Sequence, residues 1–391
     1  MPYTIFFVFF FKNNYMFSPD SQVSIESGYF ILTMMPSLFC AEKCPHCYLS
    51  KEQRADKTIM SLENINLICK KIDNYYKSKK INQKNIVLYW YGGEPTSMGM
   101  AYFEDAIKII NTSLSSEKGY TLKHVVLTSL VNIEPEWFGF FDKYCDGYFQ
   151  TSFDGRMRGK KYLEQWENRV KEATEYGLSV GTLSVINEEM LKFGAKETIT
   201  YLTNLGICEA GFLPFMLNEQ NKGKKYNRFA PTMNNWSLFM IEATKEGRKL
   251  HVQGKTPPTI GQEAFFFVQS YRNSAISNTA SQTLFLMPDG TFCLPDYKNG
   301  YEEYMRPFGN IIHQEFEEIL SGKERINYLT KQFTRNDNNE CLECAHSNYC
   351  VMEFWKENKI EDDCFGGKKY LEWLIENNES RYGDLSKSIL C

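Results

Sequence analysis

Apolar runs and amphipathic stretches alternate along the first half of this chain. The apolar runs predict six strands, at residues 28–35, 85–91, 124–129, 147–154, 178–186 and 209–215. The stretches between them predict helices, near residues 61–76, 101–114, 134–143, 162–176 and 189–204. Strands that alternate with helices pair in parallel through right-handed crossovers. The predicted fold class is therefore α/β, a partial (β/α)6 TIM-like barrel, whose open side suits a large substrate.

Three cysteines follow the first predicted strand. Cys40, Cys44 and Cys47 have the spacing CX3CX2C. Their thiolates can bind three irons of a cubane iron–sulfur cluster and leave the fourth iron open for chemistry. A loop at the carboxyl end of a barrel strand is also the usual place for an active site. By itself, this spacing does not exclude a zinc knuckle or a chance cluster of cysteines.

A second short motif, Gly92-Gly93-Glu94-Pro95, follows the second predicted strand. Two glycines let the backbone approach a ligand closely, and a carboxylate can accept hydrogen bonds from an ammonium group. Alone, a glycine pair usually marks a turn. One βα unit after the cysteine loop, the motif favours a ligand site.

Together the two motifs, with His46 in the aromatic position before Cys47, resemble those of the radical S-adenosylmethionine (radical SAM) superfamily over residues 28–216. The resemblance implies a [4Fe–4S] cluster held by the three cysteines, with SAM bound at its open iron. It also implies reductive cleavage of SAM to methionine and a 5′-deoxyadenosyl radical. His46 would flank the adenine, and Gly92, Gly93 and Glu94 would hold the methionine amino group.

The later strand ends also match the family in part. Ser152 and Asp154 lie in a Ser-x-Asp-Gly segment, where the serine helps to hold the SAM carboxylate. Ser129 stands where many relatives have Thr-Asn-Gly, so we expect it near the ribose. An arginine commonly reaches the carboxylate as well. The candidates are Arg156, Arg158 and Arg169, and sequence spacing does not distinguish them. Our working prediction is Arg169.

A second group of cysteines lies near the end of the chain. Cys341, Cys344 and Cys350 are spaced CX2CX5C, and Cys364 follows fourteen positions later. Alone, the group could be a structural zinc site. Behind a radical SAM barrel it resembles the SPASM extension, because Met-Pro-Asp-Gly290 and a later Gly-Asn-Ile segment also match. The resemblance implies one auxiliary [4Fe–4S] cluster ligated by these four cysteines.

The ligands of the second, inner SPASM cluster are missing. Residues 274–280 contain no cysteine, and Pro295 and Phe354 stand where the full motif has cysteines. Cys293 could be a substitute ligand, a substrate-facing thiol or, as we prefer, a packed apolar residue. Asp296 follows the lost position at Pro295. Relatives that form formylglycine or crosslinked peptides carry a catalytic base there, and a surface carboxylate is the alternative.

The pattern divides the chain into four segments. We predict an N-terminal strand segment (1–27), the partial barrel (28–216), a linker or substrate-facing region (217–282) and the SPASM-like domain (283–391). The last segment begins with a β-hairpin that turns at Pro-Asp-Gly290. Further helices are expected near residues 234–247, 314–331 and 367–377.

Composition limits the partners. Net charge is −4 and the pI is about 5.9, so no basic field favours nucleic acid. Twelve cysteines, seven of them in tight groups, favour metal binding in a reducing compartment. The apolar run at residues 5–11 is too short to span a bilayer and lacks preceding basic residues, so we expect a cytoplasmic protein without a membrane partner.

The resemblance implies a peptide maturase. The expected reaction is abstraction of a side-chain hydrogen from a ribosomally made precursor peptide, followed by an oxidative crosslink, with a cyclophane carbon–carbon bond as the first choice. A thioether crosslink and sulfatase-type formylglycine formation are alternatives, and a small-molecule substrate is the alternative class. A non-catalytic metal scaffold is a remote third reading. A flavodoxin- or ferredoxin-type reductant would supply electrons. No leader-recognition domain is expected before residue 28.

Overall fold

The computed structural model describes residues 24–215, 220, 229–272, 279–295, 305–334, 339–346, 361–364 and 366–378. These residues form one ten-stranded sheet in the order β10-β9-β8-β1-β2-β3-β4-β5-β6-β7. The strands are β1 Tyr29–Met34, β2 Lys84–Trp90, β3 Tyr120–Thr128, β4 Tyr148–Ser152, β5 Ser179–Ile186, β6 Ile207–Pro214, β7 Thr259–Ile260, β8 Thr283–Leu286, β9 Thr291–Pro295 and β10 Met305–Asn310.

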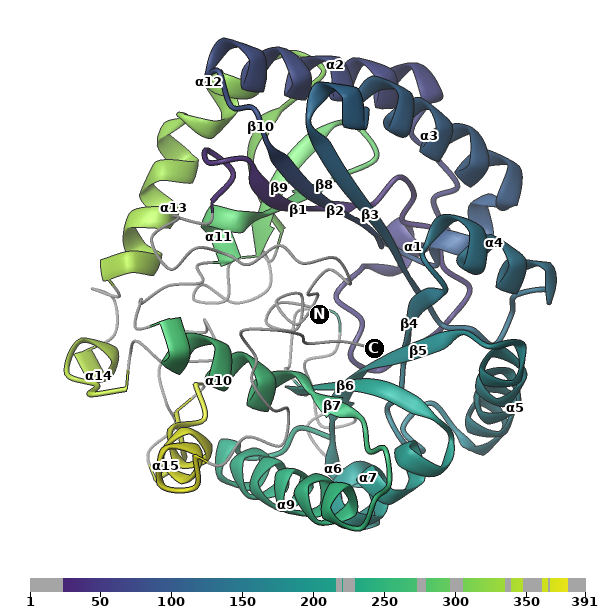
Figure 1. Cartoon of the computed structure of the whole chain (residues 1–391), viewed down its shortest axis with the longest axis vertical. Helices are drawn as coiled ribbons and strands as arrows, with labels where there is room; N and C mark the ends of the chain where they lie inside the picture. Colours follow the sequence, from purple (N-terminus) through teal and green to yellow (C-terminus); the bar gives the residue numbers. More distant parts are fainter. Residues whose placement is uncertain are drawn as a thin grey trace.

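All six predicted strands are present, and they pair in parallel in chain order. The sheet curves strongly, with its helices on the outside (Figure 1). Among the described residues, β7 and β10 form its two edges, so the barrel is partial, as predicted.

Two further strands extend the parallel sheet. β7 pairs with β6, and β8 pairs with β1 on the other side. β8 also pairs antiparallel with β9, so the predicted hairpin is present and its first strand belongs to the barrel sheet. The sheet thus crosses the predicted boundary at residue 283, and the four-segment division stays a prediction.

Most of the helices lie on the outside of the sheet (Figure 1). The helices of the first half are α1 Lys51–Ala55, α2 Leu62–Ser78, α3 Met100–Ser113, α4 Glu136–Tyr144, α5 Lys160–Tyr176, α6 Glu188–Phe193 and α7 Ala195–Asn204. Those of the second half are α9 Met233–Val252, α10 Gly261–Arg272, α11 Thr279–Gln282, α12 Phe316–Leu320, α13 Lys323–Thr334, α14 Asn339–Leu342 and α15 Lys368–Glu376. The predicted helix at 189–204 is divided at Gly194, where φ is +101°. Likewise, α12 and α13 divide the one expected at 314–331.

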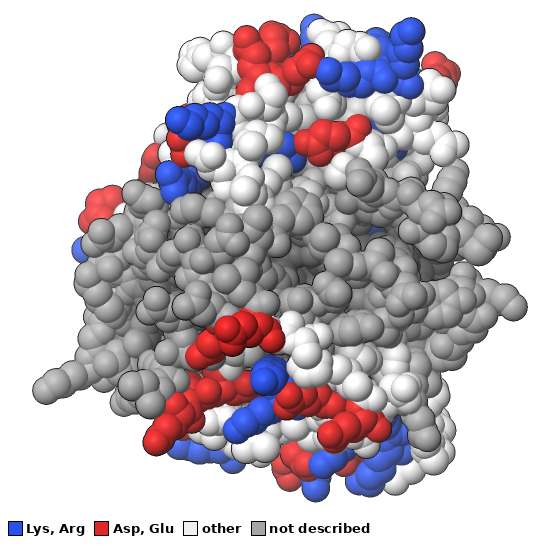
Figure 2. All heavy atoms as spheres, turned by 90° about the vertical axis from the view of Figure 1, so that its left-hand side faces the viewer, with Lys and Arg blue, Asp and Glu red and all other residues white. Residues whose placement is uncertain are grey.

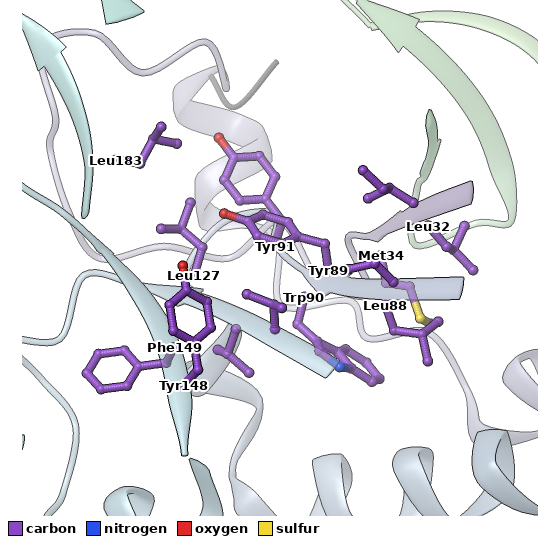
Figure 3. Packing of buried hydrophobic residues seen from close by; sticks show 14 of the residues in the cluster. Leu32, Met34, Leu88, Tyr89, Trp90, Tyr91, Leu127, Tyr148, Phe149 and Leu183 are labelled. Carbon is purple, nitrogen blue, oxygen red and sulfur yellow. The ribbon is translucent and has the colours of Figure 1, made fainter. Parts of the chain in front are cut away.

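The two faces of the strands bury different side chains. Trp90 and Phe149 point outward, where they pack on Phe103 of α3 and Phe141 of α4 with ring centroids 4.9 and 4.6 Å apart. In Figure 3 the rings of Tyr89 and Tyr91 lie on the other side of β2 from Trp90. Aromatic pairs of this kind add to the stabilisation from burial. They fix the strands and thereby the residues at the strand ends.

The outer surface carries both signs of charge. Acidic and basic side chains are interspersed over the coloured parts of the face in Figure 2. Ion pairs between exposed side chains of opposite charge include Lys245 with Glu242 at 2.9 Å and Lys79 with Glu317. Among the helices that the structure describes, none is long and apolar enough to cross a membrane.

Candidate active site

The cysteine loop lies against the Gly92-Gly93-Glu94 segment at the carboxyl ends of β1 and β2. Gly93 N donates to Ser37 O at 3.2 Å, and Glu94 N donates to Phe39 O at 2.8 Å. A Cβ on Gly93 would lie 2.1 Å from Phe39 O, and Gly92 has a φ of +118°. Both glycines are therefore required by this backbone contact, independently of any ligand.

One cavity brings most of the predicted site residues together. It is lined by all three cysteines of the first motif and by residues from the ends of β2 to β5. The predicted residues on its wall are Cys40, Cys44, His46, Cys47, Gly92, Gly93, Glu94, Ser129 and Ser152. Tyr91, Leu127 and Leu183, which Figure 3 also shows, add an apolar side. The cavity therefore joins thiol, carboxylate, hydroxyl and aromatic groups.

The thiols on this wall are suited to metal rather than to free thiolate chemistry. Burial raises the pKa of Cys40 and of Cys44 to about 12. Bound iron supplies the positive charge that would deprotonate them. Within the described residues, no three His, Cys, Asp or Glu side chains are arranged around a single metal ion. A cubane cluster is compatible with that finding, because each of its cysteines binds a different iron.

The carboxylate of Glu94 is held by groups from two strand ends. Its Oε1 accepts hydrogen bonds from Thr96 Oγ1 and Thr128 Oγ1, both at 2.7 Å, and a longer one from Thr96 N at 3.3 Å. Its Oε2 accepts one from Ser129 N at 2.7 Å. The carboxylate is therefore fixed on the cavity wall by the protein itself.

Ser129 presents a polar atom to this site. Its Oγ is buried and has no hydrogen-bond partner in the part of the chain that the structure describes. The next residue, Leu130, is fully buried with a φ of +69°, a conformation that costs a non-glycine residue about 1–3 kcal/mol. A buried hydroxyl without a partner on a cavity wall fits a polar ligand.

Asp154 and Arg158 form a buried ion pair beside the cavity. Arg158 Nη2 lies 2.5 Å from Asp154 Oδ2, and Val185 N donates to Oδ1 at 2.9 Å. Burial alone would raise the pKa of Asp154, but the Arg158 charge and the hydrogen bonds from Arg158 and Val185 N contribute to holding the pKa below its usual value. Arg158 lines the cavity, whereas Asp154 lies behind it. Arg158 Nη1 also donates to the Tyr162 hydroxyl at 2.8 Å.

The working choice of arginine is not supported by the structure. Arg169 lies in α5, paired with Glu172 at 2.6 Å and partly exposed. It is nine residues beyond the first residue of the helix, about 13 Å along its axis. Arg158 stands in the loop before the helix and reaches the cavity instead. Sequence spacing alone could not distinguish Arg158 from Arg169, although Gly159, which precedes the helix, indicates that Arg158 lies in a loop.

His46 is neutral in this setting. Burial lowers the pKa of its imidazole to about 3. The ring lies edge-on to Phe215, with centroids 6.5 Å apart. A neutral aromatic ring on the cavity wall fits an uncharged heterocycle.

The second cysteine group is described in part. Cys341 lies in α14 and Cys344 lies two residues after it. Cys364 precedes α15, and Gly367 N donates to the Cys364 carbonyl oxygen at 2.8 Å. His346 lies 3.4 Å from Glu372 of α15, so these two cysteine segments are neighbours. Cys350 and Asp296 lie outside the described residues. Cys293 is buried in β9, in agreement with a packed apolar residue.

Comparison with known proteins identifies the class of fold. No protein-family model and no curated protein sequence matches the chain. Solved structures do match, and they show that the chain has the radical SAM barrel fold of anSME and SuiB.

Two of these proteins are similar over most of the chain. The protein anSMEcpe, solved with bound AdoMet, is 15% identical, with a TM-score of 0.70 over 89% of this chain and 97% of its own. It has also been solved with the Cp18Cys peptide. SuiB of Streptococcus suis, bound to its precursor peptide SuiA, is 14% identical, with a TM-score of 0.56 over 83% of this chain and 71% of its own. At these identities the similarity shows the fold.

Proposed function

We propose that this chain is a radical SAM enzyme that modifies a peptide. The observation that carries the proposal is the single cavity on which the CX3CX2C cysteines meet Glu94, Ser129, Ser152 and Arg158. The shared fold with anSMEcpe and SuiB supports it, because structures of both contain a peptide.

The cavity residues fit both a cluster and SAM. Cys40, Cys44 and Cys47 are the cluster ligands, and such a cluster with SAM supplies a 5′-deoxyadenosyl radical by reductive cleavage. Glu94 offers a fixed negative charge for the amino group. Arg158, oriented by Asp154, offers guanidinium donors for the carboxylate, with Ser152 beside it. His46 offers a neutral ring for the adenine.

The substrate is proposed to be a ribosomally made precursor peptide. The cyclophane crosslink remains our first choice of product, and thioether or formylglycine formation remain alternatives. Asp296 is the proposed base that accepts a proton as the oxidised residue collapses to product. Loss of the inner cluster ligands argues mildly against sulfatase-type maturation. A small-molecule substrate would need a compact, closed site.

The proposed electron supply has two parts. A flavodoxin- or ferredoxin-type protein would reduce the first cluster. Cys341, Cys344, Cys350 and Cys364 would hold one auxiliary [4Fe–4S] cluster as an electron conduit. The contact between His346 and Glu372 supports this arrangement, because it joins the segments that carry the first pair and the last of these cysteines.

The radical reaction is tested by anaerobic reconstitution with iron, sulfide, SAM and dithionite. We expect 5′-deoxyadenosine to form, measured by liquid chromatography. Cys44→Ser should abolish it, because one cluster ligand is lost. Cys69→Ser is the matched control, since Cys69 is a buried thiol of α2 away from the cavity. Absence of 5′-deoxyadenosine with the wild-type protein, once its cluster is shown to be loaded, would overturn the proposal.

The number of clusters is tested by counting iron. Two [4Fe–4S] clusters give about eight irons per chain. Cys341→Ala should lower the count to about four without removing 5′-deoxyadenosine formation. A wild-type count of about twelve would mean that the inner cluster is present after all. A count of about four together with bound zinc would exclude the auxiliary cluster.

A further inference from the structure

Two aspartates directly before Cys364 contact α9, a helix that lies far away in the sequence. Asp362 Oδ2 accepts from Met233 N at 3.0 Å, and Asp362 Oδ1 accepts from Asn234 N at 2.8 Å. These are the first two backbone amides of α9, and such amides have no acceptor within their own helix. A negative charge at this end is also favoured by the helix dipole. The segment that leads to Cys364 is therefore attached to the start of α9.

Asp363 joins Cys364 itself to the same helix. Its Oδ1 accepts from Cys364 N at 2.8 Å, and its Oδ2 accepts from the hydroxyl of Ser237 at 2.6 Å. Ser237 belongs to α9, and both side chains are buried. Oδ2 also accepts from Lys369 N of α15 at 3.1 Å. One carboxylate thus connects the backbone of Cys364 to two helices.

The helix α9 is in turn packed on the barrel. Its Phe239 contacts Phe212 of β6, with ring centroids 5.7 Å apart. After Cys364 the chain stays close to α9, because a Cβ on Gly367 would lie 2.4 Å from a ring atom of Trp236. The position of the Cys364 backbone is therefore set by α9 and, through α9, by the barrel.

We propose that Asp363 is the positioning residue of Cys364 as a ligand of the auxiliary cluster, and that its bond to Ser237 holds this ligand in place relative to the barrel. The inference rests on the proposed function, since it takes Cys364 as a cluster ligand. A group that orients a metal ligand strengthens the binding of the metal, because the ligand loses less conformational freedom when it binds. The auxiliary cluster should therefore retain its iron better with this carboxylate and hydroxyl than without them.

The experiment follows iron loss from the reconstituted protein. The protein is mixed anaerobically with bathophenanthroline disulfonate, a chelator that gives a coloured complex with Fe(II), and the absorbance gives the rate of release. Cys341→Ala should keep the first cluster alone, so it identifies the part of the release that belongs to that cluster.

Ser237→Ala removes the hydroxyl and leaves the bond between Asp363 and Cys364 N. We expect the auxiliary cluster to lose iron about tenfold faster, as for the loss of an orienting group around a metal ligand. Asp363→Ala should have a larger effect, because the bond to Cys364 N is lost as well. The first cluster should release iron at the wild-type rate in both variants, which also shows that their barrels are folded.

Thr232→Ala is the matched control on the same helix. Thr232 Oγ1 accepts from Asn235 N at 3.1 Å and so caps α9. Its loss weakens the start of the helix but keeps the bond between Ser237 and Asp363. We expect wild-type rates of iron loss from both clusters.

Other outcomes contradict the inference. Equal acceleration by Ser237→Ala and Thr232→Ala would assign the effect to the stability of α9. Wild-type rates in both Ser237→Ala and Asp363→Ala would make Asp363 only a structural residue. A wild-type protein with about four irons in all would lack the auxiliary cluster, and the inference would fail while 5′-deoxyadenosine formation still decided the proposed function.

Discussion

Asp154 and Glu209 are two buried carboxyl groups of the same barrel whose pKa values are shifted in opposite directions. Asp154, after β4, has an arginine partner, a backbone donor and a lowered pKa. Glu209, near the start of β6, accepts from the Tyr148 hydroxyl at 3.0 Å, and its Oε1 has no hydrogen-bond partner within the described residues. Burial raises the pKa of Glu209 to about 7, despite this bond and nearby Lys123.

Pairing, and not depth, therefore decides which carboxyl is charged. The carboxyl ends of the strands hold a charged residue with its counterion beside the candidate site. Inside the barrel, buried polar side chains are joined by a series of hydrogen bonds instead. Tyr89 donates to Gln150 at 2.6 Å, and Gln150 donates to Tyr148 at 2.9 Å. With the bond from Tyr148 to Glu209, this chain links β2, β4 and β6.

The largest expected effect comes from breaking the buried ion pair between Asp154 and Arg158. Arg158→Ala should lower the free energy of unfolding by about 3–5 kcal/mol at pH 7, because Asp154 is left buried without its counterion. Urea denaturation monitored by circular dichroism measures it. The loss should shrink toward acidic pH, where Asp154 can protonate.

Arg169→Ala is the matched control for this prediction. Arg169 and Glu172 form a partly exposed pair on α5, for which about 0–1 kcal/mol is expected. If both arginine variants lost the same small amount, the buried pair would be no stronger than a surface pair, and the comparison with Glu209 would fail.

A smaller effect, with a defined pH dependence, is expected at Glu209. Its folded-state pKa of about 7 lies above the ordinary value of 4.5, so the folded state binds the proton more tightly. This stabilisation is complete below pH 4.5 and is lost as the pH rises through 7. Glu209→Gln keeps a neutral acceptor and should gain about 2–3 kcal/mol over the wild type between pH 5 and pH 8.

Urea denaturation of both proteins across that pH range measures this difference. Glu189→Gln, at an exposed pair with Lys192, serves as the control for removing a carboxylate. A difference that changes in the opposite direction would mean that Glu209 is ionised and paired with Lys123.

The sequence predicted the six strands β1 to β6 and their parallel pairing, but not the strands that extend the sheet on either side. Hydrophobic runs located β1 to β6, because each run is long enough to show a pattern. β7 has two residues, Thr259 and Ile260, and no pattern can show through so few. β8 was expected in a hairpin, but its pairing with β1 joins residues some 250 positions apart in the chain and depends on the tertiary fold.

The residues of the candidate site also fall into two groups, those that the sequence could indicate and those that it could not. The cysteines and Gly92-Gly93-Glu94 lie within short segments, so local spacing was enough to find them. Thr128 acts on Glu94 from the end of β3, and only the pairing of β2 with β3 brings the two residues together. Glu209 stood at the start of a predicted strand, where nothing local indicates that it faces the interior.

The smallest expected effect tests the space in which the Tyr148 hydroxyl reaches Glu209. A Cβ on Gly181 of β5 would lie 2.4 Å from the Tyr148 hydroxyl oxygen, so glycine leaves the space through which this hydroxyl reaches Glu209. Gly181→Ala should cost about 1–2 kcal/mol in urea denaturation, since the ring must move and Glu209 loses its donor. The pH at which stability falls should also rise, because the bond that lowers the pKa of Glu209 is weakened. In a Tyr148→Phe background the same change should cost less. An equal cost in both backgrounds would mean that Gly181 is required for the strand itself and not for the hydroxyl.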